Sequence, residues 1–138
     1  MEQINEVLEF KTNGKEIINI TTELKEYLNS VKVKNGIMNL TLLHTSASII
    51  IQENADPDVL KDLLNYFEKI VEENPNFHHS SEGPDDMPAH IKSTLTQSNT
   101  TLSIINSELV LGIWQDVYLF EHRVNPKIRK ILVHIVGE

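Results

Sequence analysis

The sequence predicts an α+β fold, with residues 1–138 forming a single domain built as a mostly antiparallel β-sandwich with two main helices. The length of 138 residues suits one domain with its own core. Many short β-prone segments are separated by turn signals, which predicts roughly seven to nine strands. Only two segments carry a long apolar stripe at helical spacing, and strands and helices rarely alternate along the chain.

The N-terminal third is expected to form two strands and then a helix. Ile4–Ile20 is rich in β-prone residues around Asn13-Gly14, and Asn-Gly is the strongest short hairpin signal. Thr21 or Thr22 is the expected N-cap. The helix itself is indicated by an apolar stripe at i, i+3, i+4 and i+7, formed by Leu24, Tyr27, Leu28 and Val31. The segment is expected to end at a turn at Asn35-Gly36.

The middle of the chain predicts two strands and the clearest helix. Gly36–Leu43 and Ala47–Ile51 are strand-like, and the second is apolar enough to be buried on both faces. Asp56 is an N-cap followed by Pro57 at the first helical position. The buried stripe of this helix is expected to contain Val59, Leu60, Leu63, Leu64, Phe67, Ile70 and Val71, and Pro75 closes the helix.

The C-terminal half begins with a loop, Asn74–Pro88, whose length is typical of functional or disordered segments. A short helix is expected from Pro88 to Leu95. The remaining segments are predicted to be strands joined by turns at 106–107 and 125–126, namely Thr101–Ile105, Leu109–Ile113, Val117–Arg123 and Ile128–Val136.

Composition excludes several classes of function. The formal net charge of −8 with scattered Lys and Arg argues against nucleic acid as a partner. No apolar run is long enough to span a membrane, and the N-terminal residues do not form a signal peptide. The absence of cysteine removes disulfides and thiolate chemistry, and it fits a reducing, cytoplasmic location.

Histidines and carboxylates near the ends of elements are the candidates for chemistry. Without cysteine, a divalent metal such as zinc or magnesium would need His, Asp or Glu as ligands. The candidate ligands are His44, His79, His90 and His122, with Glu82, Asp85, Asp86 or Glu121 in support. No two histidines have the i, i+4 spacing of a helical zinc site, and exposed or hydrogen-bonded structural histidines are the alternative. One of Asp85 and Asp86 is also expected to cap the short helix.

Polar residues beside these histidines suggest an anion site. Thr45 and Ser46 are interpreted as donors to an anion, and Asn54 could turn toward a ligand at a helix N-terminus. A serine hydrolase using Ser46 is a weaker alternative, because no Gly-x-Ser-x-Gly elbow surrounds it. Gln115 lies in a further polar cluster with Trp114, and Arg123 could face phosphate oxygens.

These motifs together resemble the YjbQ family, also called the secondary thiamine-phosphate synthase family, over nearly the whole chain. The resemblance is carried by His44-Thr45-Ser46-Ala47, Glu53–Pro57, Glu82–His90 (EGPDDMPAH), Leu111-Gly112, Trp114-Gln115, Glu121-His122-Arg123 and Gly137-Glu138. The family usually has Gly where this chain has Asp116. The resemblance implies a compact α/β sandwich, a homotrimer, a metal or anion site built from the histidines, and a weak thiamine-phosphate synthase activity.

The leading hypothesis is a small metal-assisted enzyme acting on a phosphorylated small molecule, with a divalent metal, zinc or magnesium, as cofactor. Its predicted catalytic residues are His44, His90, His122, Asp85 and Asp86, and His79 joins the three histidines as a predicted metal ligand. Its predicted substrate or anion contacts are Thr45, Ser46, Asn54, Gln115 and Arg123. The alternative is a non-catalytic module that binds a metal or small anion, and a hydrolase using the same residues is a third possibility.

Overall fold

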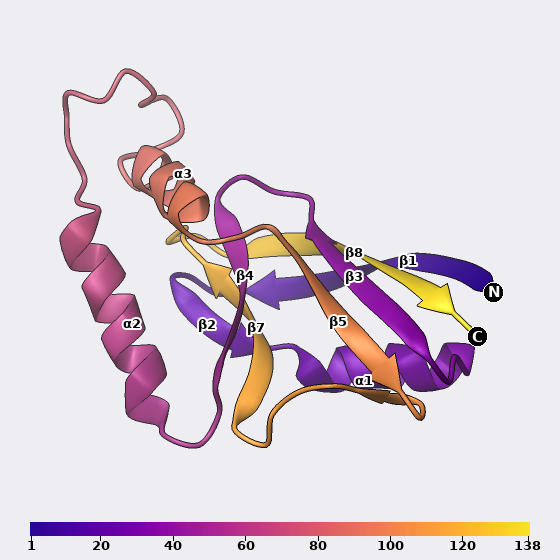
Figure 1. The fold of residues 1–138 in the computed structure, drawn as a ribbon. Helices are drawn as coiled ribbons and strands as arrows, with labels where there is room; N and C mark the ends of the chain where they lie inside the picture. The colour runs from indigo at the N-terminus through magenta and orange to yellow at the C-terminus, as the bar shows by residue number, and fades with distance from the viewer.

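Eight strands and three helices make up the chain, and every strand pair is antiparallel, so the predicted fold class is confirmed. The computed structural model describes all residues from Met1 to Glu138. One sheet has five strands in the order β1-β8-β3-β5-β6, and the other has three in the order β2-β7-β4 (Figure 1). No helix is both long and apolar enough to cross a membrane.

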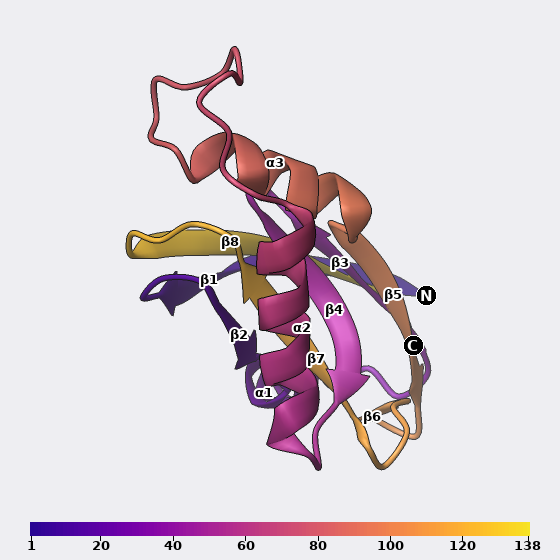
Figure 2. The same cartoon turned by 90° about the vertical axis from the view of Figure 1, so that its left-hand side faces the viewer.

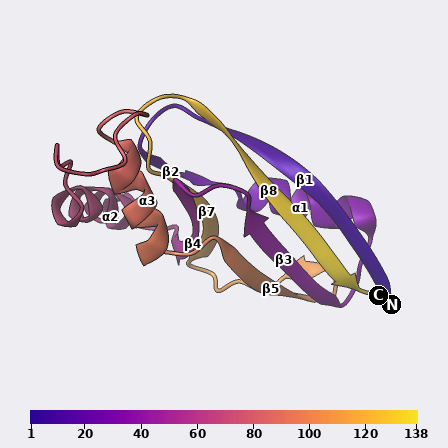
Figure 3. The same cartoon turned by 90° about the horizontal axis from the view of Figure 1, so that it is seen from above.

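The five-stranded sheet is built around the two longest strands. β1 (Glu2–Thr12) pairs along its whole length with β8 (Lys127–Gly137), which places the two chain termini side by side (Figures 1 and 3). β3 (Gly36–Leu42) pairs with β8 on one side and β5 (Asn99–Ile105) on the other. A turn with positive φ at Asn106 and Ser107 leads to β6 (Glu108–Leu109), which completes the sheet.

The three-stranded sheet carries the central strand β7. β7 (Gln115–Glu121) lies between β2 (Glu16–Asn19) and β4 (Ala47–Glu53). The core fills the space between the two sheets and α1 (Thr21–Val31) with side chains that include Leu24, Met38, Ile49, Leu119 and Ile131. Burial of this apolar surface is the main force that holds the layers together.

Two helices lie on the other side of the small sheet. α2 (Pro57–Ile70) crosses in front of β4 and β7 (Figure 2), and its Phe67 ring packs edge-on against Phe120 of β7 at 5.4 Å between centroids. The predicted cap is confirmed, since Asp56 accepts a hydrogen bond from the Asp58 amide. None of the α2 side chains is fully buried. α3 (Asp86–Leu95) follows a long loop that extends away from the sheets (Figure 1).

Several local expectations were wrong, each because a distant contact outweighs a local signal. Residues around Asn13-Gly14 form a turn, but β1 and β2 belong to different sheets and make no hairpin. Neither Thr21 nor Thr22 caps α1; the Thr21 hydroxyl instead pairs with the backbone of Val117.

α1 ends at Lys32 in the left-handed conformation, before the expected turn at Asn35-Gly36. The strand expected from Gly36 is confirmed as β3, and a Cβ atom on Gly36 would lie 2.1 Å from the Val136 carbonyl oxygen. Of the strand expected at 109–113, only Leu109 is in a strand, as the second residue of β6.

Candidate functional site

Three connections meet at one end of the small sheet. The segment between β3 and β4 contains His44, Thr45 and Ser46, the loop before α3 contains His79, and the turn after β7 contains His122 and Arg123. Hydrogen bonds join them, because His90 Nδ1 bonds the Thr45 carbonyl at 2.8 Å and the Arg123 guanidinium reaches the start of α3. The fold therefore brings most of the polar motifs of the sequence to one place.

The centre of this region is a triangle of His79, Asp86 and His90. Each offers one ligand atom, and these three atoms lie within 4.8 Å of one another. Asp86 Oδ2 lies 2.6 Å from His79 Nε2 and 3.1 Å from His90 Nε2. Glu82 brings a second carboxylate to 3.1 Å from the same His79 nitrogen. Two imidazoles and a carboxylate form a ligand set that suits a zinc-like ion.

Asp86 and His90 come together because both lie on α3, one turn apart. The helix starts at Asp86, two residues before the expected start at Pro88, so the pair has i, i+4 spacing on one face. His90 therefore lies in the second helical turn, whereas the later start would have placed it in the first. The spacing signal was present in the sequence, but it involved an Asp and a His instead of two histidines.

Arg123 fixes the acidic residues of this site. Its Nε donates to Asp85 Oδ2 at 2.9 Å, its Nη1 donates to Asp86 Oδ1 at 2.6 Å, and its Nη2 donates to the Glu82 carbonyl. The expected anion contact by Arg123 is thus replaced by an internal ion pair. Asp85 stands at the helix start, but its carboxylate accepts from Arg123 and the Val124 amide and makes no capping hydrogen bond.

Electrostatics keep both carboxylates ionised. Burial alone would raise the pKa of Asp86, but the hydrogen bond with His79 and the Arg123 charge outweigh it and lower the pKa. The pKa of Asp85 is lowered in the same way, because the Val124 amide and Arg123 outweigh the effect of burial. The pKa of Arg123 is raised by Asp85 and Asp86 in spite of its own burial. The site therefore presents a charged carboxylate to its two imidazoles.

His122 is close in sequence to Arg123 but has a different environment. Its ring is 1% exposed, Nε2 lies 2.8 Å from Ser48 Oγ, and Nδ1 has no partner. Burial lowers the pKa of His122 to about 3, and the charges of Lys92 and Arg129 act in the same direction. His122 is thus a neutral, buried residue, and the structure does not place it in the triangle.

His44 also lies outside the triangle. Its Nε2 accepts a hydrogen bond from the Lys130 amide at 2.8 Å, so that nitrogen is not available as a ligand. Burial, followed by the Arg129 charge, lowers the pKa of His44. Among the predicted metal ligands, the fold therefore brings together His79 and His90 but not His44 and His122.

A buried ion pair between Arg129 and Glu121, which the sequence analysis did not identify, lies beside the segment that contains Ser46. Arg129 donates Nε and Nη2 to Glu121, and Nη2 also donates to Ser46 Oγ at 3.0 Å. Ser46 is consequently occupied, while Thr45 is exposed beside His90. Arg129 shares a strand face with the core residues Ile131 and Val133. The position of Arg129 on an otherwise apolar strand face could have indicated this ion pair from the sequence. A charge is not buried in a core without a partner, so an acidic partner was to be expected.

Asn54 and Gln115 lie at the opposite end of the small sheet. β4 runs antiparallel to β7, so Ala47 pairs with Glu121 at one end and Glu53 pairs with Gln115 at the other. The two ends are about 20 Å apart at the usual rise per strand residue. Asn54 donates to the Asp116 carboxylate, and Gln115 accepts from the Gly112 amide. Within one chain, these two residues do not join the histidine triangle.

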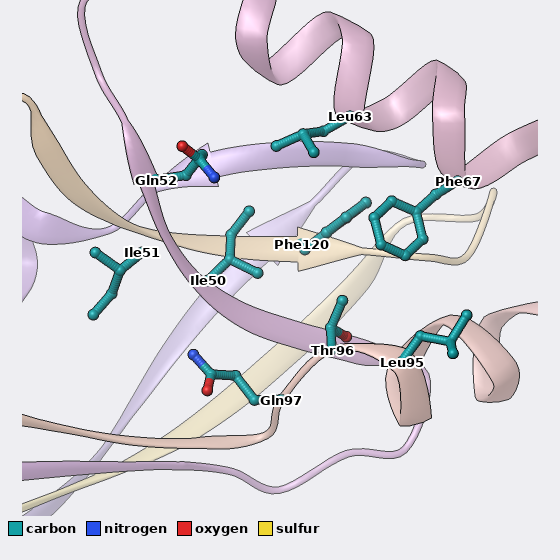
Figure 4. A pocket seen from close by; sticks show the side chains of 9 residues that line it. All are labelled: Ile50, Ile51, Gln52, Leu63, Phe67, Leu95, Thr96, Gln97 and Phe120. Atoms are coloured by element: carbon teal, nitrogen blue, oxygen red, sulfur yellow. The ribbon is translucent and has the colours of Figure 1, made fainter.

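Two cavities lie near these elements. One of about 420 Å³ adjoins the triangle, because His79 is among its lining residues with Phe77 and Pro84. The other, of about 370 Å³, lies between α2, β4 and the end of α3 (Figure 4). Its walls contain no ionisable side chain and are formed by Ile50, Ile51, Gln52, Leu63, Phe67, Leu95, Thr96, Gln97 and Phe120. Of these two cavities, only the first is lined by a residue of the triangle.

Comparisons with known proteins show similarity along nearly the whole chain. A family model described as "UPF0047 protein YjbQ-like" matches residues 6–138. The UPF0047 protein sll1880 of Synechocystis is 46% identical over 137 residues, which cover 99% of this chain and 93% of that protein. The UPF0047 protein YjbQ of Salmonella typhimurium is 42% identical over 120 residues, covering 86% of this chain and 87% of that protein.

Solved structures show the same fold. A protein of the YjbQ/UPF0047 family from Clostridium acetobutylicum is 35% identical with a TM-score of 0.83, covering 96% of this chain and 99% of that one. A YbjQ-like protein of unknown function from Sulfolobus solfataricus has a TM-score of 0.86 at 22% identity, covering 99% of this chain and 100% of that one. The second likeness concerns the fold alone.

Proposed function

The chain belongs to the YjbQ-like family UPF0047, and we propose that it is a metal-assisted enzyme acting on a phosphorylated small molecule. The observation that carries the proposal is the convergence of His79, Asp86 and His90, with three ligand atoms within 4.8 Å of one another. Two imidazoles with a carboxylate favour zinc over magnesium, since magnesium prefers an all-oxygen octahedral shell.

The hydrogen bonds around His90 support a cation at this position. His90 Nδ1 donates to the Thr45 carbonyl, so the neutral ring carries a lone pair on Nε2. That nitrogen lies 3.1 Å from Asp86 Oδ2, which is also an acceptor. Two acceptors at this distance repel unless a proton or a metal ion lies between them. A carbonyl that orients the second ring nitrogen is the usual outer partner of a metal-bound histidine.

The surrounding residues have defined roles in this proposal. Arg123 holds Asp86 by its Oδ1 atom and leaves Oδ2 directed at the histidines. Glu82 can add a fourth ligand or leave that position to a water or substrate oxygen. The exposed Thr45 hydroxyl is the candidate donor to a phosphate oxygen. His44 remains a predicted catalytic residue, as a neutral imidazole on the segment that contacts α3.

Thiamine phosphate formation is the reaction suggested by the family resemblance. The thiazole nitrogen would form a bond to the methylene carbon of the pyrimidine diphosphate, and the bond from that carbon to pyrophosphate would break. The electron pair would leave with pyrophosphate, and a divalent ion held by His79, Asp86 and His90 would supply positive charge toward it. Since Arg123 is engaged by Asp85 and Asp86, few cations remain for a diphosphate. This favours a weak, secondary activity.

Metal content and turnover test the proposal together. We expect purified protein to contain close to one zinc ion per chain, and His79→Ala and His90→Ala each to lose it while circular dichroism shows an unchanged fold. His78→Ala is the matched control, because His78 is an exposed neighbour of His79 outside the triangle. Pyrophosphate release from the pyrimidine diphosphate and thiazole phosphate should follow the metal content. Full metal binding by His90→Ala would contradict the assignment.

A non-catalytic metal module is the second candidate, because the triangle is tied to a buried ion pair between Arg123 and two aspartates. In that case a chelator would lower the unfolding temperature, while no phosphorylated substrate would be turned over under any metal condition. The enzyme proposal expects turnover that returns when zinc is added back to the chelated protein.

We also propose that the chain assembles as a homotrimer in the cytoplasm, as the family resemblance implies. Exposed apolar side chains support an additional interface, among them Ile113 and Trp114 near the far end of β7 and Tyr66 on α2. Light scattering should then give a mass three times the chain mass of 15.8 kDa. A monomer at micromolar concentration would exclude a stable trimer.

A further inference from the structure

Asn13-Gly14 is a sequence motif that neither a hairpin nor the metal site uses. It connects β1 to β2, which belong to different sheets. Asn13 is exposed, and Gly14 has a φ of +132°, which residues other than glycine rarely adopt. The Gly14 amide donates to no backbone carbonyl. An exposed asparagine followed by a free glycine amide is the arrangement in which the asparagine side chain can react with its own backbone.

The second Asn-Gly pair of the chain, Asn35-Gly36, has a different environment. The backbone of Asn35 is fixed by two hydrogen bonds with the backbone of Glu138, at 2.8 and 2.9 Å. Its side-chain Oδ1 accepts from the Asn106 amide at 3.1 Å. Gly36 begins β3, which is paired on both sides. A reaction between the Asn35 side chain and the Gly36 amide would have to break several of these bonds first.

A third exposed asparagine before a small residue, Asn106-Ser107, is also held. Both residues have positive φ, as Gly14 does, so a strained turn alone does not distinguish the two positions. The Ser107 amide, however, donates to the Lys34 carbonyl at 2.8 Å. Of these three positions, only Asn13 is followed by an amide without a backbone partner.

We propose that Asn13 is a site of spontaneous modification, at which the asparagine is converted to aspartate and isoaspartate with loss of ammonia. Hydroxide removes the proton of the Gly14 amide, and the amide nitrogen forms a bond to Cγ of Asn13. The bond from Cγ to Nδ2 breaks, and its electron pair leaves with the nitrogen as ammonia. Water then opens the resulting succinimide ring. Opening at Cγ gives aspartate, and opening at the main-chain carbonyl gives isoaspartate, with no change in oxidation state.

The products would lie beside the turn that carries Arg123. A Cβ atom on Gly14 would lie 3.2 Å from the Val124 carbonyl oxygen, so the two turns are close to each other. On the other side, the buried Thr12 donates its hydroxyl to Glu121 at 2.6 Å. Aspartate adds a negative charge here, and isoaspartate lengthens the main chain between Thr12 and Gly14. The modification would therefore change the backbone next to buried contacts of the candidate site.

Peptide mapping by mass spectrometry tests the proposal on the folded protein, incubated at mildly alkaline pH and sampled over days. We expect Asn13 to lose ammonia at least about tenfold faster than Asn35, because hydrogen bonds must break before Asn35 can react. Both isoaspartate and aspartate should appear at residue 13. In urea the two asparagines should react at similar rates, since each then precedes a glycine in an unfolded chain. The control Asn13→Gln should remove the reaction at this position, because the longer side chain closes a less favourable ring.

Three results would overturn the proposal. Equal rates at Asn13 and Asn35 in the folded protein would show that the fold does not select the site. A rate at Asn13 that rises on unfolding as much as the rate at Asn35 would show that the turn protects Asn13. Formation of aspartate without isoaspartate would exclude the succinimide, and with it the attack by the Gly14 amide.

Discussion

The Arg123→Met substitution should destabilise the protein severely. The Arg123 side chain is 8% exposed and pairs with Asp85 and Asp86, whose side chains are 5% and 3% exposed. Removing one partner of a buried ion pair costs about 3–5 kcal/mol, because the remaining charge is left uncompensated. Here two carboxylates lose the same partner, so a small effect is not expected.

The remaining contacts set the magnitude within that range. Asp85 would keep the Val124 amide, and Asp86 would keep His79 and His90. These hydrogen bonds retain part of the compensation, so we expect a loss of about 3 kcal/mol in the free energy of unfolding. Since whole domains are stable by about 5–15 kcal/mol, the variant should still fold.

Urea unfolding followed by circular dichroism at pH 7 measures this loss. The control is Lys61→Met, which removes an exposed ion pair with Asp58 at 3.9 Å and should cost less than about 1 kcal/mol. A loss in Arg123→Met no larger than in the control would refute the reasoning.

Acidification gives an independent check. Asp85 and Asp86 have lowered pKa values in the folded state, so their stabilisation is present above about pH 4 and is lost as the pH falls through the folded-state pKa. Arg123→Met should show a smaller loss of stability over that acidic range than the unchanged protein.

Two further predictions concern buried groups. Because the pKa of His122 is lowered to about 3, the unfolded chain binds its proton first on acidification, and stability should fall by about 2 kcal/mol between pH 7 and pH 5. Urea unfolding at both pH values should show this fall in the protein and lose most of it in His122→Gln; an equal fall in both would assign it to other groups. Gly36→Ala should cost about 3 kcal/mol, because its Cβ would meet the Val136 carbonyl at 2.1 Å and backbone cannot easily move aside. Thermal unfolding would measure that cost, and an unchanged midpoint would show that β3 and β8 can separate freely.

The fold was predictable where local chemistry and burial agree. Asp56-Pro57 marks the start of α2 in the sequence, and the structure confirms both the cap and the helix. Asn13-Gly14 marks a turn equally well, but the partner of each flanking strand is decided by the core. β1 gains eleven paired positions with β8, and β2 pairs with β7 instead. A hairpin signal therefore predicts that the chain changes direction, but it does not identify which strand each flanking strand pairs with.

Several residues of the candidate site could be identified from the sequence, but their arrangement in space could not. The segment from Glu82 to His90 was identified by its unusual composition, and it does contain Asp86 and His90 of the triangle. Its orientation depends on Arg123, which lies 37 residues after Asp86. Gln115 could not be separated from the site by sequence alone, because only the register of β7 places it at the far end of the sheet.

The end of β7 explains why these distant segments converge. Three successive residues there leave the strand toward three different partners: Glu121 toward Arg129, His122 toward Ser48 and Arg123 toward the start of α3. Each contact is buried, so the position of α3 relative to the sheet is fixed by ion pairs and hydrogen bonds in addition to apolar packing. Such pairs add little net stability compared with apolar residues, but they allow few alternative arrangements. The triangle itself is more exposed than these contacts, which is the arrangement expected of a site that must admit a ligand to rigidly held side chains.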